Sequence, residues 1–142
     1  MRHELDIRPD GGLAVVTTHG EACLEGFRAF TDELVRNRLP SRATPVLVDH
    51  RDLDLSTMLK ADIDAFRRYV ADQLATLRRE PHATAPRLAT LVGRTLDFGI
   101  VRQWEIPLED ELPMRHRAFL DHDAAVAWLS SEADDPTGDA QS

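Results

Sequence analysis

The stretch Pro45-Val46-Leu47-Val48-Asp49-His50-Arg51-Asp52-Leu53-Asp54-Leu55-Ser56 decides the fold of this chain. Its apolar start, residues 46–48, is an unbroken run of the kind found in strands that helices cover on both faces, as in a parallel sheet. We therefore expect this strand at the centre of the sheet. The polar residues 49–56 predict a loop, and the apolar spacing that follows predicts a long amphipathic helix.

Outward from this stretch, the hydrophobic pattern predicts the remaining elements. Before it, two short alternating runs around Asp10-Gly11-Gly12 predict a hairpin, and apolar residues at helical spacing predict a helix that stops before Pro40. After it, the pattern predicts a helical stripe from Leu59 to Leu77, a buried strand over residues 88–92, a helix from about Thr95 that ends or kinks at Pro107, an edge strand over 114–119 and a last helix containing Val126, Trp128 and Leu129.

This order predicts an α/β fold with a mixed, mostly parallel open sheet. About five strands are expected, an N-terminal hairpin followed by three strand-helix units, together with four helices. At 142 residues the chain is expected to form a single domain over residues 1–130, followed by an acidic, disordered tail over 131–142. Ligands of open sheets usually bind beyond the carboxyl ends of the strands, which indicates the loops at 49–56 and 93–97.

Composition narrows the class of function. The net charge is −8, and about half of it belongs to four acidic residues of the tail, so a nucleic-acid partner is not expected. No apolar run approaches the length of a membrane span. The single Cys23 cannot form an intramolecular disulfide and no charged-then-apolar leader opens the sequence, so we expect a cytoplasmic protein.

The element order and three segments resemble the SpoIIAA-like family of small bacterial proteins, over about residues 3–130. The segments are Pro45-Val46-Leu47-Val48-Asp49 to Leu55-Ser56, Phe98-Gly99-Ile100-Val101-Arg102-Gln103-Trp104-Glu105 and Ala124-Ala125-Val126-Ala127-Trp128-Leu129. That family is grouped with STAS domains and has a fold akin to the CRAL-TRIO lipid carriers. The resemblance implies a regulatory or binding module, with an apolar ligand groove and no established chemistry.

Ser56 and Thr57 are candidate phosphate acceptors. Anti-anti-sigma STAS proteins carry an Asp-Ser-(Ser/Thr)-Gly motif just after the central strand, and its serine is phosphorylated. The corresponding region here reads Leu55-Ser56-Thr57-Met58-Leu59-Lys60, without the glycine and the Asp-Ser pair. A phosphate at a helix start would be stabilised by the helix dipole. The alternative, which we favour, is that Ser56 is an N-cap.

The predicted ligand site lies between the helix starting near Ser56 and the helix containing Gly99. It comprises Ser56, Thr57, Phe98, Gly99 and Arg102. A glycine inside a helix destabilises the helix by about 1 kcal/mol relative to alanine, so the presence of Gly99 requires an explanation. Either a ligand approaches the backbone there, with Arg102 meeting an anionic head group, or the helix packs closely on the sheet and Arg102 pairs with Glu105 on the surface.

Two further groups of residues are candidate sites of chemistry. Asp49, His50, Asp52 and Asp54 could form a metal or acid/base cluster. Alternate side chains of an extended segment point in opposite directions, however, so solvated loop carboxylates are favoured. Cys23 could be an activated thiol at a helix start, and the alternative is that it replaces a capping serine. We expect no metal and no cofactor.

Three functional hypotheses follow. The first is a non-enzymatic cytoplasmic regulatory or binding module for a small apolar or amphipathic ligand or a partner protein. The second is a hydrolase-like enzyme that uses the Asp49/His50/Asp52 loop. The sequence weighs against it, because no set of nucleophile, base and orienting group can be assembled. The third is a structural homodimer that exposes an apolar patch.

Overall fold

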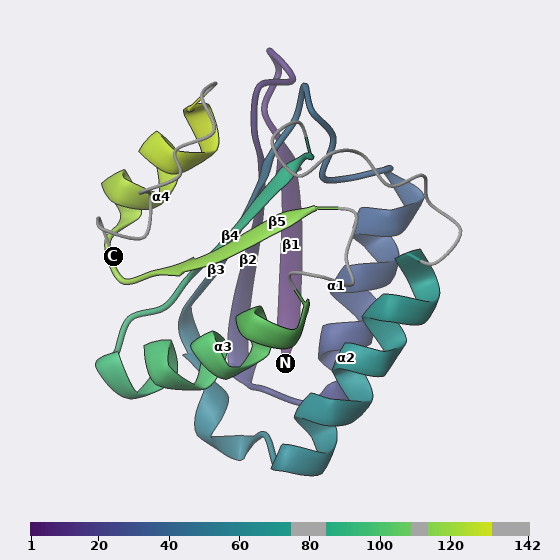
Figure 1. Cartoon of the computed structure of the whole chain (residues 1–142), viewed down its shortest axis with the longest axis vertical. Coiled ribbons are helices and arrows are strands. Elements are labelled where there is room, and N and C mark those ends of the chain that lie inside the picture. Colours follow the sequence, from purple (N-terminus) through teal and green to yellow (C-terminus); the bar gives the residue numbers. More distant parts are fainter. Residues whose placement is uncertain (75–84, 109–113, 132–142) are drawn as a thin grey trace.

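A computed structural model gives the architecture of residues 1–74, 85–108 and 114–131, with side chains described for all of these except 74 and 103–108. The described residues form one five-stranded sheet in the order β1-β2-β3-β4-β5 and four α-helices (Figure 1). β1 (Arg2–Ile7) is antiparallel to β2 (Ala14–Glu21). β2, β3 (Val46–Asp54), β4 (Arg87–Leu91) and β5 (Arg115–Phe119) run parallel to one another. The mixed, mostly parallel sheet predicted from the sequence is confirmed.

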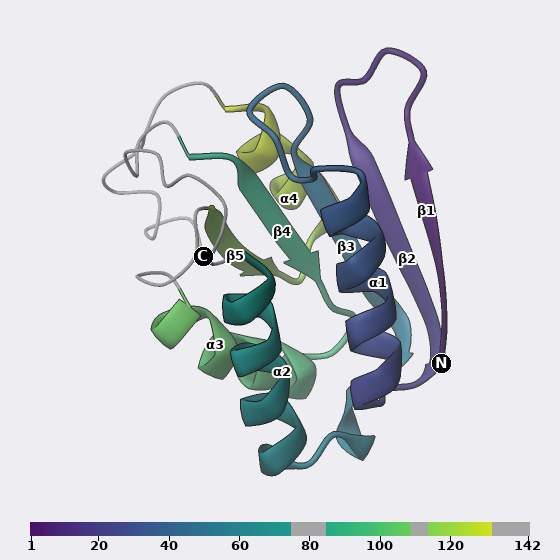
Figure 2. The ribbon, with the colours of Figure 1, turned by 90° about the vertical axis from the view of Figure 1, so that its right-hand side faces the viewer.

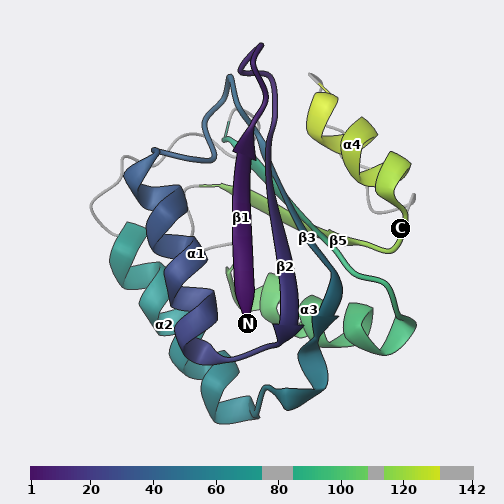
Figure 3. The same cartoon turned by 180° about the vertical axis from the view of Figure 1, so that it is seen from behind.

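The strands follow one another across the sheet in chain order, and this decides where the helices lie. Parallel strands are joined by right-handed crossovers, so successive crossovers in one direction place their helices on one face. α1 (Leu24–Arg36), α2 (Lys60–Leu74) and α3 (Thr95–Leu108) accordingly lie in front of the sheet in Figure 2. α4 (His122–Ser130) lies alone behind it, and Figure 3 shows α4 on the other side of the strands from α1 and α2.

Two hydrophobic clusters lie on the two faces of the sheet. The larger one joins α1, α2 and α3 to the sheet and includes Phe27, Phe66 and Val101, while the smaller one joins α4 to β3 and β4. β3 contributes to both, because Val46 and Val48 belong to the first cluster and Leu47 to the second. These three side chains are at most 2% exposed, which confirms the prediction of a central strand covered on both faces.

β3 contains a β-bulge that the sequence did not reveal. The pairing with β2 moves from Thr17↔Asp49 to His19↔Asp52, so β3 has one residue more than β2 over this interval. As a result, Arg51 and Asp52 are both exposed between two buried residues, His50 and Leu53. The predicted loop over residues 49–56 is therefore wrong for its first part, since the strand continues to Asp54.

The start of the long helix α2 also differs from the prediction. Asp54 caps a short 3₁₀ turn, η1 (Leu55–Thr57), and α2 begins at Lys60, so Ser56 is not the N-cap of α2. Leu59, expected on the buried stripe of this helix, is 68% exposed because it precedes the helix. Leu77, the last residue expected on that stripe, lies outside the described residues.

The start of α1 follows the prediction. Cys23 is its N-cap, and its sulfur accepts a hydrogen bond from the backbone N–H of Gly26 at 3.4 Å. This confirms the interpretation of Cys23 as a replacement for a capping serine. Within the described part of the chain, no helix has the length and apolar character required to cross a membrane.

Candidate functional site

The main candidate site is an apolar cavity of about 80 Å³ between helices α1 and α2 and strands β3 to β5. It is only partly enclosed. Aromatic side chains of the helices form one wall, and the sheet supplies two imidazoles and a hydroxyl to the other. The residues that matter most for its chemistry are Phe27, Phe30, Phe66, His50, Thr90 and His116.

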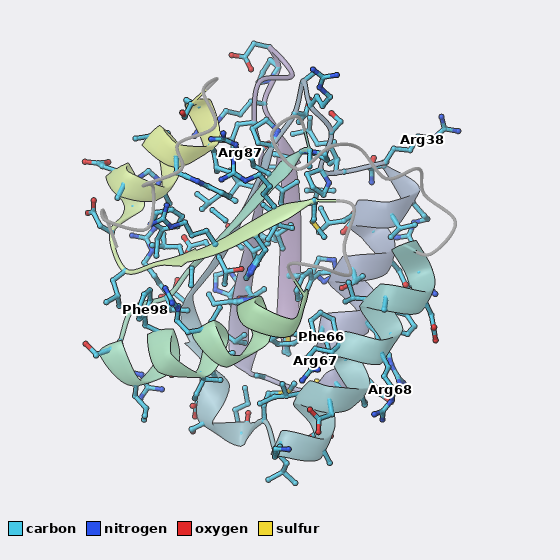
Figure 4. All side chains as sticks on the ribbon, viewed as in Figure 1. Arg38, Phe66, Arg67, Arg68, Arg87 and Phe98 are labelled. Carbon is cyan, nitrogen blue, oxygen red and sulfur yellow. The ribbon has the colours of Figure 1, made fainter. Side chains whose placement is uncertain are left out.

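The position of these side chains follows from the two periodicities of the sequence. On the sheet, residues two apart share a face, so His50 points to the same side as Val48, and Thr90 to the same side as Leu88. On α1, the stripe that was predicted to be buried brings Phe27 and Phe30 against the sheet. Figure 4 shows Phe66 of α2 between its helix and the sheet, whereas Arg68 lies on the outer side of the helix.

The polar groups of the cavity wall take part in two hydroxyl–imidazole pairs, one of which includes Thr18 from outside the cavity. Thr18 Oγ1 lies 2.7 Å from Nδ1 of His50, and the same hydroxyl donates to the backbone carbonyl of Asp49 at 3.2 Å. Thr90 Oγ1 lies 2.8 Å from Nε2 of His116. These four side chains come from four neighbouring strands, so they form a polar track across the helix-covered face of the sheet.

Burial keeps both imidazoles of this track neutral. It lowers the pKa of His50 from 6.5 to about 3, against the opposing effect of the Asp49 carboxylate and with a smaller contribution from His116. Burial likewise lowers the pKa of His116 to about 4. The His50 ring is also packed between aromatic groups, stacked on Phe27 with the ring centroids 5.4 Å apart and edge-on to Phe30 at 5.8 Å. At neutral pH the cavity therefore presents uncharged polar groups.

The residues of the predicted ligand site lie elsewhere. The hydroxyl of Ser56 donates to the Asp54 carboxylate at 2.6 Å, and that of Thr57 donates to the carbonyl of Ala22 at 2.6 Å. Both residues are exposed, and both hydroxyls already hold the turn together. Hydrogen bonds from the side chain and backbone of Ser56 lower the pKa of the Asp54 carboxyl.

The residues of α3 in that predicted site do not reach the cavity either. Phe98 packs against the larger hydrophobic cluster, and the guanidinium of Arg102 lies 6.0 Å from the centre of its ring. In Figure 4, Phe98 lies above the start of α3, away from Phe66. None of the five residues of that site lines the cavity. Glu105, the expected partner of Arg102, has a side chain outside the described ones.

Gly99 is not required by close packing. A Cβ atom built at this position meets no heavy atom within 4 Å, so the explanation of Gly99 by close helix-to-sheet contact is wrong.

Replacing Gly99 with alanine is therefore expected to raise the free energy of unfolding by about 0.5–1 kcal/mol, since alanine restricts the unfolded chain and is the better helix former. Urea denaturation would measure the change. Gly20 is the matched control, because its φ of +98° strains any other residue and Gly20→Ala should destabilise the protein. A loss of stability in Gly99→Ala would mean that a contact of this glycine is needed.

The Asp49/His50/Asp52 group is not gathered into one site. The Asp49 carboxylate binds the guanidinium of Arg51 at 2.8 and 3.0 Å; burial acts to raise the Asp49 pKa, but these hydrogen bonds hold it below its usual value. His50 points to the opposite face, and Asp52 lies 3.9 Å from His19. Among the residues that the structure describes, no group of three or more His, Cys, Asp or Glu side chains could hold a metal ion.

Sequence reasoning missed the polar track because it placed His50 in a loop and gave His116 no role. For His50 and Thr90 the sequence did contain a signal. His50 continues the alternation of Val46 and Val48, and Thr90 continues that of Leu88. His116 was hidden between two arginines on an edge strand, where a polar residue is unremarkable.

Comparisons with known proteins bear on the fold. No protein-family model matches the chain, and no curated protein matches it. Among solved structures, it is similar to an uncharacterised protein from Shewanella loihica, described as a member of the DUF3478 family with a SpoIIAA-like fold. The two share 17% identity with a TM-score of 0.50, over 90% of this chain and 92% of the other. Together with the strand order and the helix placement, this similarity confirms that the chain has a SpoIIAA-like fold.

Proposed function

We propose that this chain is a non-enzymatic, cytoplasmic binding module that holds a small, largely apolar molecule, or the apolar end of a larger amphipathic one. The observation that carries the proposal is the cavity between α1, α2 and the sheet, which combines aromatic walls with a few fixed polar groups. Ligand sites in proteins have this composition.

The size of the cavity limits the ligand. Drug-sized ligands occupy about 300–1,000 Å³, whereas an engineered apolar cavity of about 150 Å³ binds benzene. A volume of about 80 Å³ thus suits a molecule of a few heavy atoms or one end of a longer molecule that extends through the open side. A monocyclic ring requires small shifts of the lining side chains.

The chemistry of the two histidines favours binding over catalysis. A general base works best when its pKa is near the working pH. The pKa values of His50 and His116, about 3 and about 4, lie far below neutrality, so neither imidazole is a strong base there. A regulatory role would then arise if α1 or α2 changed position when a ligand fills the cavity.

Toluene is a suitable first probe, because it is apolar and has a single ring, which the cavity can admit after small shifts of its lining side chains. We expect saturable methyl chemical-shift changes at Leu34, Val48 and Leu88, which line the cavity, when toluene is titrated into the full chain. A ligand present at about 100 times its Kd should also stabilise the protein by about 2.7 kcal/mol.

A pair of matched variants locates the binding. Val70→Phe adds a ring at the cavity wall and should weaken toluene binding at least tenfold, whereas Val126→Phe makes the same change on α4, on the other face of the sheet, and should leave it unchanged. The absence of any shift in the wild type, or an equal effect of both variants, would overturn the proposal. Native mass spectrometry of the same samples reports whether a partner copy is present.

A further inference from the structure

The contacts of Thr18 favour one hydrogen-bonding state of the His50 ring. The hydroxyl of Thr18 has one proton and two acceptors within reach: the carbonyl of Asp49 at 3.2 Å, which can only accept, and Nδ1 of His50 at 2.7 Å, which can accept or donate. The assignment in which both contacts are hydrogen bonds gives that proton to the carbonyl. The 2.7 Å contact between Thr18 Oγ1 and His50 Nδ1 is then a hydrogen bond only if Nδ1 carries the proton and donates it. In a neutral imidazole, the other nitrogen, Nε2, is left as an acceptor.

The direction of Nε2 follows from the same contact. Nδ1 faces Thr18 on β2, and Thr18 does not line the cavity. The opposite edge of the ring, with Nε2, is therefore directed away from β2, toward the side where Leu88 and Thr90 of β4 line the cavity. An acceptor that faces an apolar cavity favours a ligand that brings a hydrogen-bond donor, because a buried polar group without a partner is costly.

We propose that His50 makes the cavity selective for an uncharged molecule with a hydroxyl group, a phenol or an alcohol, whose O–H donates to Nε2. This inference rests on the proposed function and names the chemistry of its ligand. A carboxylate could bind this nitrogen only if the imidazole were first protonated, and an ammonium group would enter the apolar cavity without a counter-charge. We therefore expect the cavity to bind neither carboxylates nor ammonium compounds.

The experiment compares phenol with toluene, which have the same shape but differ in the donor group, and uses benzoate as the charged analogue. The variant is the double substitution Thr18→Val with His50→Leu, which removes both partners of the buried hydrogen bond together and keeps the side-chain volume similar. Binding to wild type and variant is followed by methyl chemical shifts at neutral pH. We expect the ratio of phenol to toluene affinity to be at least about tenfold lower in the variant, with toluene binding retained. Benzoate should not bind at the concentrations at which phenol saturates.

The outcomes separate this inference from the proposed function. If toluene binds but the ratio is the same in wild type and variant, or if benzoate binds as well as phenol, the selectivity is wrong and the binding module stands. If neither toluene nor phenol binds, both proposals fail. The ¹⁵N chemical shifts of the His50 ring give a second test that needs no ligand: a proton on Nδ1 supports the inference, and a proton on Nε2 overturns it.

Discussion

Replacing Phe27 with alanine is expected to lower the free energy of unfolding by about 3–5 kcal/mol, a large part of the 5–15 kcal/mol typical of a domain. The ring of Phe27 is fully buried and lies at the centre of the aromatic wall. Its centroid is 5.3 Å from that of Phe30, 5.0 Å from that of Phe66 in an edge-to-face arrangement, and 5.4 Å from the His50 ring. Truncation therefore removes packing from two helices and the central strand at once.

Chemical denaturation monitored by circular dichroism measures this loss, with Phe27→Leu as a milder variant should the alanine variant be partly unfolded. Leu59→Ala is the control for removing a large apolar side chain, because Leu59 is 68% exposed and its truncation should cost less than about 0.5 kcal/mol. A loss below about 1.5 kcal/mol for Phe27→Ala would show that the aromatic wall is loosely packed.

Acidification should destabilise the protein well above the pH at which carboxylates usually titrate. Below pH 6.5 the unfolded chain protonates His50 and His116, whereas the native state keeps them neutral until about pH 3 and about pH 4. The unfolded state then binds more protons, so the free energy of unfolding falls as the pH falls. Each histidine contributes about 1.4 kcal/mol per pH unit, which amounts to roughly 5 kcal/mol for both between pH 6.5 and 4.5.

The contribution of His50 can be isolated with the Thr18→Val/His50→Leu variant. Its free energy of unfolding should fall with about half the slope of the wild type between pH 6.5 and 4.5, because one histidine of the pair remains. Urea denaturation at half-unit steps of pH measures both slopes. Equal slopes would mean that His50 is protonated in the native state or is accessible to water there.

The fold was predictable because it depends on patterns that any side chain of the right class satisfies. The unbroken run at residues 46–48 and the stripe with Phe27 and Phe30 are decided by apolar spacing alone. The candidate site was not predictable in the same way. It depends on His50 and His116, which were judged by their charged neighbours in the sequence, whereas their environment is decided by strands and helices that are distant in the sequence.

The charged residues around His50 illustrate the reason. Asp49, Arg51, Asp52 and Asp54 predict a solvated loop, since few strands contain so many charges. The bulge makes the segment a strand nonetheless, by letting two charged residues in succession face solvent. Because residues 49–56 are predicted to be a loop, the long helix is expected to start near Ser56, about one turn before its actual start at Lys60. The predicted site therefore included Ser56 and Thr57.

At the bulge, the central strand can lose a residue while its side chains keep their present faces of the sheet. Before it, even-numbered residues such as Val48 face α1 and α2, and after it, odd-numbered residues such as Leu53 do so. Loss of one residue between His50 and Leu53 would give regular pairing with β2 and leave both halves facing as they do now. Deletion of one residue from Val46 to Val48 would instead turn the side chains that precede the deletion to the opposite face of the sheet. We therefore expect this part of the strand to tolerate a deletion at the bulge but not before it.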